Sequence, residues 1–210
     1  GQCVLNGSQV HWTKEVEEEL VEKGNEGMHD YYAKLVQQLT EMVMLIRGDI
    51  SKAARVTVGA LAVIDVHARD VQLKMAEEGV SKVTDFDWIS QMRYYWEDGD
   101  INEGKGDLAI TMVIAKRMYG YEYLGNSFRL VITPLTDKCY LTLMGALQMT
   151  LGGAPAGPAG TGKTETTKDL ARALALPCYV FNCSDQMNYQ TMADIFRGLA
   201  QSGTWGCFDE

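Results

Sequence analysis

In the first part of the chain, apolar residues recur every three or four positions, which is the spacing of amphipathic helices. Four stretches are predicted as helices on this pattern: residues 13–23, 29–47, 55–75 and 85–96. Gly48 follows the second stretch, at the position where glycine commonly ends a helix. Asp85 or Asp87 can cap the start of the fourth. The pattern therefore predicts a mainly helical region at the beginning of the chain.

The pattern changes after a polar, glycine-bearing break at residues 99–106. Apolar residues then alternate as in a strand: Leu108, Ile110, Met112 and Ile114. After a turn at 133–136, helices and strands alternate, which is typical of a parallel sheet with crossover helices. The expected elements are helix 137–148, helix 164–175, strand 178–182, helix 191–201 and strand 204–208. A short strand is also assumed over 152–156, although its small residues and Pro155 suit a buried strand poorly. The predicted fold class is α/β.

One segment matches the phosphate-loop pattern G-x-x-x-x-G-K-[ST] at every position: Gly157, Pro158, Ala159, Gly160, Thr161, Gly162, Lys163 and Thr164. Glycines let successive backbone N–H groups converge on an anion, and the helix that follows adds its positive dipole end. Lys163 supplies a charge for the β- and γ-phosphates, and Thr164 supplies a hydroxyl for Mg²⁺. The segment predicts a nucleoside triphosphate site. A glycine-rich turn before a helix is the simpler alternative.

Residues 205–210 are predicted to form an apolar strand that ends in two acids. In phosphate-loop ATPases an aspartate at a strand end holds Mg²⁺ directly or through water, and this role is predicted for Asp209. Glu210 is predicted to be the general base that activates water, with Lys163 as the second catalytic residue. Two acids at a strand end are by themselves more often a solvated turn, so the assignment depends on the phosphate loop. ATP is favoured over GTP because no Asn-Lys-x-Asp guanine motif is present.

Composition narrows the classes of partner. The chain has 210 residues and a formal net charge of −9, which argues against nucleic acid and anionic membranes as partners. Its five cysteines are scattered without the spacing of a zinc site or disulfide framework, which favours a reducing compartment. No stretch is apolar enough to span a membrane, so a soluble protein is expected. The first residue is not Met and the chain stops at the acidic pair, so we expect a piece of a longer protein.

Three other features have simpler structural interpretations. His67 lies on the apolar stripe of its predicted helix, and no ligand-type residue accompanies it at metal-site spacing, so a half-buried core histidine is expected. The glutamates of residues 13–23 are expected to form a solvated helix face. The aromatic residues of 85–96 could stack on bases, but their acidic flanks favour a packing or interdomain role.

Several segments together resemble the first AAA+ module of a dynein heavy chain: residues 133–140, 157–166, 180–187 and 205–210. Upstream, residues 91–96 and 119–125 are similar to the end of the dynein linker and its junction with that module. Residues 182–187, Asn-Cys-Ser-Asp-Gln-Met, resemble axonemal chains more than cytoplasmic ones, and outer-arm types in particular. Lys138 stands where the family usually has arginine, which keeps the charge but loses the planar fork.

The resemblance implies two regions: residues 1–117 as the C-terminal part of the linker, and residues 118–210 as the N-terminal part of the first AAA+ module. The AAA+ sheet would be cut after its acidic strand. The resemblance also implies that Glu165 belongs to the nucleotide-binding segment and that Pro134, Leu135 and Thr136 lie near the adenine. The implied cofactors are ATP and Mg²⁺. The implied partners are microtubules, reached through other parts of the parent chain, dynein intermediate and light chains, and other heavy chains. The implied location is the cytoplasm, the cytoskeleton and the axoneme of a cilium or flagellum.

Three functions remain open at this point. A motor ATPase would use hydrolysis to move the linker and drive ciliary or flagellar beating. A regulatory or structural module would bind nucleotide with little turnover and would not need Glu210 as a base. An interaction scaffold would depend on residues 1–117 and would have no nucleotide affinity. The isolated segment is expected to be nearly inactive, because the family's sensor residues, lid and arginine finger lie beyond Glu210.

Overall fold

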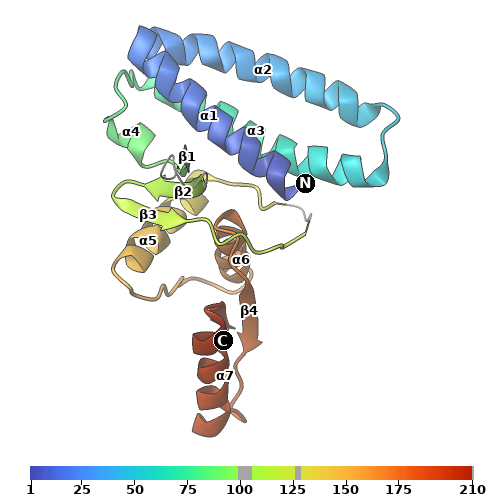
Figure 1. Ribbon diagram of the computed structural model, residues 1–210, viewed down its shortest axis with the longest axis vertical. Helices are drawn as coiled ribbons and strands as arrows, with labels where there is room; N and C mark the ends of the chain where they lie inside the picture. The colour runs from blue at the N-terminus through green and yellow to red at the C-terminus, as the bar shows by residue number, and fades with distance from the viewer. Residues whose placement is uncertain (99–105, 126–128, 210) are drawn as a thin grey trace. The chain divides into compact units, whose positions relative to one another are not determined.

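The computed structural model describes residues 1–98, 106–125 and 129–209 (Figure 1). Its contacts divide the chain into two compact units. Unit 1 comprises Gly1–Met118 and Gly125–Gly153, and unit 2 comprises Tyr119–Leu124 and Ala154–Glu210. The predicted break over 99–106 lies outside the described residues, except for Gly106.

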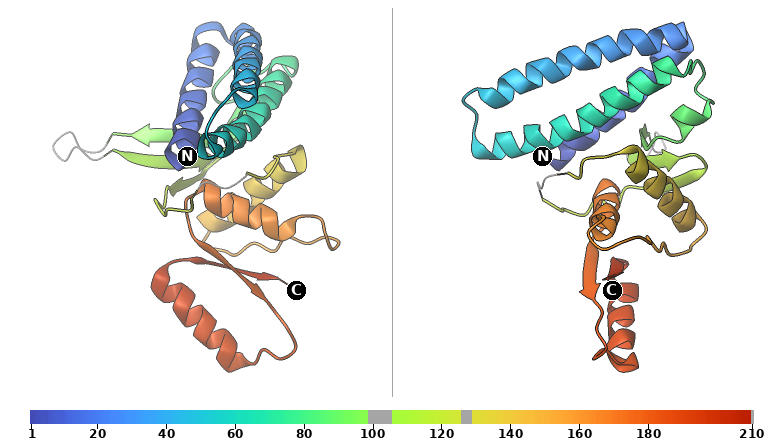
Figure 2. Two further views of the ribbon diagram at one scale, coloured as in Figure 1. Left: turned by 90° about the vertical axis from the view of Figure 1, so that its right-hand side faces the viewer. Right: turned by 180° about the vertical axis from the view of Figure 1, so that it is seen from behind.

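Three long helices begin unit 1: α1 (Gln2–Lys23), α2 (Asn25–Arg47) and α3 (Lys52–Glu77). They lie side by side in every view (Figures 1 and 2). Each contributes an apolar stripe to one core, whose buried members include Val16, Leu20, Met28, Tyr31, Leu35, Ala68, Val71 and Met75. These helices confirm three of the four that the spacing predicts. Helix α1 starts eleven residues earlier than expected (13 minus 2). The sequence pattern missed this first part of the helix because the residues before Thr13 lack a clear apolar stripe.

The fourth predicted helix, over 85–96, is wrong. Only one helical turn forms, α4 (Phe86–Ile89), and the chain then enters strand β1 (Arg93–Glu97). Strand β1 pairs antiparallel with β2 (Asp107–Met112), and β2 pairs antiparallel with β3 (Ala115–Met118). Aromatic residues favour strands when cross-strand neighbours are available, and this tertiary pairing overrides the helical spacing. The alternation over 108–114 correctly predicts β2 as far as Met112, whereas Ile114 lies in the turn between β2 and β3.

Two side chains that were expected to be structural are packed inside unit 1. Trp88 on α4 is fully buried and meets Trp12 edge to face, with ring centroids 5.3 Å apart. His67 on α3 is partly buried, and its Nε2 lies 3.4 Å from Asp137 Oδ1. Burial lowers the pKa of His67, although the carboxylate of Asp137 acts in the opposite direction. Both side chains have the packing role that their positions in the sequence suggest.

Helix α5 (Pro134–Gln148) also belongs to unit 1. The predicted turn over 133–136 is instead the start of this helix: Thr133 is the N-cap and its Oγ1 accepts from the backbone N–H of Thr136 at 3.3 Å. Proline at the first helical position suits this start, because its missing N–H would have no helical partner there. At the other end, Arg117 of β3 donates to the carbonyl of Leu147. These contacts hold α5 to the sheet of unit 1. The division into units therefore differs from the predicted boundary between residues 117 and 118, which would assign α5 to the second region.

Unit 2 contains α6 (Lys163–Ala173), β4 (Cys178–Asn182), α7 (Tyr189–Ser202) and β5 (Trp205–Asp209). Strands β4 and β5 pair in parallel, with Asn182 opposite Asp209. The alternation of helices and strands is therefore confirmed over these residues, with ends shifted by one or two positions. The strand assumed over 152–156 does not form in the structure, since residues 151–157 have no regular hydrogen-bonding pattern. The parallel sheet described here has two strands.

The segment 119–124 belongs to unit 2 although it precedes α5 in sequence. The backbone N–H of Gly120 donates to Leu174 O at 2.8 Å, and that of Glu122 to Ala175 O at 3.1 Å. A Cβ at Gly120 would lie 2.5 Å from the carbonyl oxygen of Ala175, so only glycine permits this approach. These bonds attach the segment to the C-terminal end of α6. No helix among the described residues is both long and apolar enough to cross a membrane.

Candidate nucleotide-binding site

The phosphate loop runs into α6 through two glycines in left-handed conformation. Gly160 has φ +75° and Gly162 has φ +80°, a region that glycine enters at no steric cost. Gly162 directly precedes α6, so the helix begins at Lys163. Thr161 Oγ1 donates to the carbonyl of Pro158 at 2.9 Å and closes the turn. The exposed loop thus sits at the positive end of a helix, where backbone N–H groups can receive an anion.

The side chain of Lys163 folds back over this loop. Its Nζ donates to the carbonyl of Gly157 at 3.0 Å and to that of Pro158 at 2.8 Å. These bonds hold the ammonium group against the loop instead of leaving it free in solvent. The positive charge is therefore placed beside the backbone that would receive phosphate oxygens.

The structure brings together the two residues predicted to serve Mg²⁺. Thr164 Oγ1, in the first turn of α6, donates to Asp209 Oδ2 at 2.7 Å, at the end of β5. The residues are 45 positions apart in sequence, so the contact depends on the fold. A hydroxyl and a carboxylate oxygen are hard ligands of the kind that Mg²⁺ prefers, usually with phosphate oxygens and water completing the set. The pair fits such an ion.

The end of β5 is held in place from three sides. The backbone N–H of Cys183 donates to the carbonyl of Asp209 at 2.8 Å. Phe208 stacks on Phe181 of β4 and also contacts Phe196 of α7, each with ring centroids 5.3 Å apart. Cys183 was noted from the sequence only as part of the segment 182–187, and Phe196 was not singled out. The apolar periodicity of α7 was the only signal that could have pointed to Phe196.

A thiol lies close to the acidic end of β5. Burial and the nearby carboxylate of Asp209 raise the pKa of Cys207. The thiol is therefore neutral near pH 7 and is a poor metal ligand. No group of three or more His, Cys, Asp or Glu side chains that could hold a metal occurs within residues 1–98, 106–125 and 129–209.

Three further groups of residues were predicted for this site: Glu165, Glu210, and the segment Pro134, Leu135 and Thr136. Glu165 is exposed and pairs with Lys168 at 2.7 Å along its own helix. Glu210, the predicted general base, lies outside the described residues. Pro134, Leu135 and Thr136 form the first turn of α5 in unit 1, where Leu135 is exposed and Thr136 is buried. Their predicted contact with adenine stays a prediction.

Comparison with known proteins adds independent findings. Residues 119–210 match the model of a family described as the hydrolytic ATP binding site of the dynein motor region. The whole chain is 57% identical to dynein axonemal heavy chain 12 of Rattus norvegicus and 55% identical to dynein axonemal heavy chain 3 of Mus musculus. It is 56% identical to dynein axonemal heavy chain 1 of Homo sapiens.

All three alignments cover 100% of this chain but only 6%, 5% and 5% of the respective relatives. These relatives confirm the expected resemblance to axonemal chains. The finer expectation of an outer-arm type is not tested by them and stays a prediction. The identity over all 210 residues, together with the phosphate loop and the acid-ended strand, makes this chain similar along its whole length to a segment of axonemal dynein heavy chains.

Proposed function

We propose that this chain is part of a motor ATPase that binds ATP with Mg²⁺ at Gly157–Thr164 and hydrolyses it. The observation that carries the proposal is the 2.7 Å hydrogen bond between Thr164 and Asp209. A hydroxyl at the loop and a carboxylate at a strand end are the two protein oxygens that a phosphate-loop site uses for its ion. Mg²⁺ held there would neutralise charge on the phosphates.

The residues of this chain divide the remaining work. Backbone N–H groups of the loop and the ammonium of Lys163 bind and orient the β- and γ-phosphates. Glu210, which follows Asp209, accepts a proton from the water that attacks the γ-phosphorus, while the bond to the bridging oxygen of ADP breaks. Positioning and charge neutralisation supply most of the rate in such phosphoryl transfers.

We further propose that residues 1–117 are the end of the linker and residues 118–210 the N-terminal part of the first AAA+ module. Hydrolysis would then drive linker movement and, in the intact protein, ciliary or flagellar beating. Microtubules, intermediate and light chains and other heavy chains would be partners of that intact protein in the axoneme. The segment alone would turn over ATP feebly, because an arginine finger in trans contributes about 10³ to 10⁵ in rate in related enzymes.

The test is microtubule-stimulated ATP turnover of the intact parent chain with the single change Glu210→Gln. We expect turnover to collapse while ATP binding is retained, since glutamine keeps the shape but cannot take a proton. Glu41→Gln, at an exposed position on α2, is the matched control and should leave turnover unchanged. Unchanged turnover in Glu210→Gln would instead favour the alternative, a nucleotide-binding regulatory or structural module with little turnover.

A further inference from the structure

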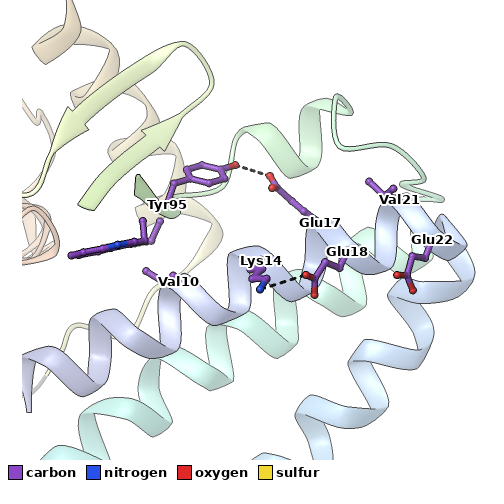
Figure 3. Close-up of a pocket in the computed structure, with 9 residues that line it drawn as sticks. Val10, Lys14, Glu17, Glu18, Val21, Glu22 and Tyr95 are labelled. Atoms are coloured by element: carbon purple, nitrogen blue, oxygen red, sulfur yellow. Dashed lines mark hydrogen bonds and ion pairs between the residues drawn. The ribbon is translucent and has the colours of Figure 1, made fainter. Parts of the chain in front are cut away.

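A groove of about 430 Å³ runs between α1 and strand β1 in unit 1 (Figure 3). One wall is a face of α1 that turns away from the buried core and carries Val10, Lys14, Glu18, Val21 and Glu22. These positions recur at the three- and four-residue spacing of a single helix face. The opposite wall is the aromatic run of β1, including Tyr95 and Trp96. None of these residues belongs to the proposed ATP site, so the inference below is independent of the ATPase proposal.

The floor of the groove is held rigidly by hydrogen bonds. Glu17 Oε1 accepts from Tyr95 Oη at 2.6 Å and from Trp88 Nε1 at 3.2 Å, and Figure 3 shows Tyr95 reaching Glu17 across the groove. Both donors use the same oxygen, and Glu17 Oε2 has no hydrogen-bond partner within the described part of the chain. A carboxylate with one free oxygen is therefore fixed in position at the base of the groove.

The indole of Trp96 is also held in place, although 55% of the residue is exposed. A Cβ at Gly106 would lie 2.4 Å from this ring, so the indole lies directly against the backbone of Gly106. An exposed tryptophan fixed on one face offers its other face to a ligand. Val21, 74% exposed, adds apolar surface on α1.

The groove carries an excess of negative charge. Its walls carry the carboxylates of Glu17, Glu18 and Glu22 and the ammonium of Lys14, while the guanidinium of Arg93, 3.9 Å from Glu17 Oε1, offsets the charge of Glu17. The Lys14–Glu18 pair is long, at 3.7 Å, and both side chains are more than half exposed, so it is weak and readily exchanged. Glu22 has no ion-pair or hydrogen-bond partner among the residues that the structure describes.

We propose that this groove docks an arginine-bearing amphipathic polypeptide segment. A guanidinium group stacks on an indole face and bonds carboxylates through its planar fork, while its aliphatic stem covers apolar surface. The fixed indole of Trp96, the carboxylates of Glu18 and Glu22, and the exposed side chain of Val21 supply these three partners within one groove. A second copy of this chain is a poor occupant, because two such acidic faces would repel each other.

The proposal is tested by fluorescence anisotropy of a labelled peptide, in which arginine and leucine alternate, added to the intact heavy chain. The matched probe has citrulline in place of arginine, which keeps the shape and removes the charge. We expect the arginine peptide to bind more tightly than the citrulline peptide and to lose affinity as salt rises. The double change Glu18→Gln with Glu22→Gln should weaken binding about tenfold, the effect of losing two partly exposed ion pairs.

Two further variants locate the binding site. Trp96→Ala should weaken binding while Trp96→Phe, which keeps an aromatic face, should retain most of it. Glu41→Gln, on α2 away from the groove, should have no effect. Equal binding of both peptides, or affinity that the groove variants leave unchanged, would overturn the proposal. So would self-association of the heavy chain in sedimentation that Trp96→Ala abolishes, since a second copy would then be the occupant.

Discussion

At the scale of single residues, the contact between Thr164 and Asp209 is the main support for the proposed Mg²⁺ and ATP site. Either residue alone has an ordinary structural interpretation: a threonine at the start of a helix and an acid at a strand end. Their 2.7 Å hydrogen bond brings together an oxygen at the start of α6 and an oxygen at the end of β5. Lys163, bound to two loop carbonyls, brings the positive charge to the same loop.

The first prediction concerns the hydroxyl of Thr164. Thr164→Ala should weaken Mg²⁺-dependent ATP binding to the parent chain by about tenfold or more, the usual effect of losing a hydrogen bond to a charged group. Thr164→Ser keeps the hydroxyl and should restore most of the affinity. Titration calorimetry with and without Mg²⁺ provides the measurement. If alanine and serine bind alike, the hydroxyl has no part in holding the ion.

The second prediction concerns Asp65 on α3. Burial raises the pKa of Asp65 to about 6 from an ordinary value of 3.8, although a hydrogen bond from Ser8 at 3.3 Å partly opposes the shift. Because the folded-state pKa is raised, the stability contributed by this group is present below about pH 4 and is lost as pH rises through 6. Asp65→Asn should remove that slope and stabilise the fold above pH 6 by about 1–3 kcal/mol.

Urea unfolding of the chain between pH 4 and pH 7 provides the measurement for Asp65. Asp49→Asn, at an exposed position after α2, is the control and should leave the pH profile unchanged. A profile of Asp65→Asn that runs parallel to that of the wild type would show that this carboxyl does not titrate in the range expected.

At the scale of elements, close approach between backbones decides which positions tolerate a side chain. Helices α1 and α2 turn back on each other at Gly24, which has φ +60°. Just beyond, a Cβ at Gly27 would lie 2.6 Å from the carbonyl oxygen of Glu19. In contrast, nothing lies within 4 Å of a Cβ at Gly7 of α1. Two helical glycines in one unit thus have different reasons for being glycine.

The third prediction compares these two glycines. Gly27→Ala should lower the free energy of unfolding by about 1–3 kcal/mol, because it forces α1 and α2 apart against a packed core. Gly7→Ala should raise it by about 0.5–1 kcal/mol, the difference in helix propensity between the two residues. Thermal or urea unfolding of both variants measures the sign of each change in the free energy of unfolding. Stabilisation by Gly27→Ala would mean that the helices are packed less closely than described.

At the scale of the whole molecule, the chain comprises two units with different kinds of core. Unit 1 buries aromatic and aliphatic side chains between three helices, a three-stranded sheet and α5. In unit 2, α6 contributes buried residues, including Leu170 and Leu174, whereas α7 has none. The proposed ATP site draws its loop and its acid-ended strand from unit 2 alone. Nucleotide should therefore stabilise the two units unequally.

The fourth prediction follows from that inequality. ATP with Mg²⁺ should slow hydrogen exchange in the phosphate loop, in the first turn of α6 and in β5, because a ligand protects the segments that it stabilises. Exchange within the core of α1–α3 should change little in the same experiment. Lys163→Ala should abolish the protection and serves as the control. Protection confined to α1–α3 would place the nucleotide elsewhere.

The sequence by itself determined what depends on local order. The phosphate-loop residues, α6, α7 and both strands of the parallel sheet follow from motif and alternation, because turns, caps and side-chain periodicity act over a few neighbours. The same reasoning determined the three long helices and the packing role of His67. It also predicted a role for Asp209, because an acid that ends an apolar strand occurs in the same chain as a complete phosphate-loop motif.

Only the tertiary structure decided the features that depend on distant partners. Residues 93–97 became a strand because β2 offers them hydrogen bonds, which outweighed their helical spacing. Residues 152–156 did not become a strand, because their small side chains offer little surface to pack in a sheet and Pro155 lacks the N–H that a strand would donate. The contact of Thr164 with Asp209, and the groove that joins Glu17 of α1 to Tyr95 of β1, unite residues 45 and 78 positions apart. Periodicity describes one segment at a time, so it cannot specify which segments meet.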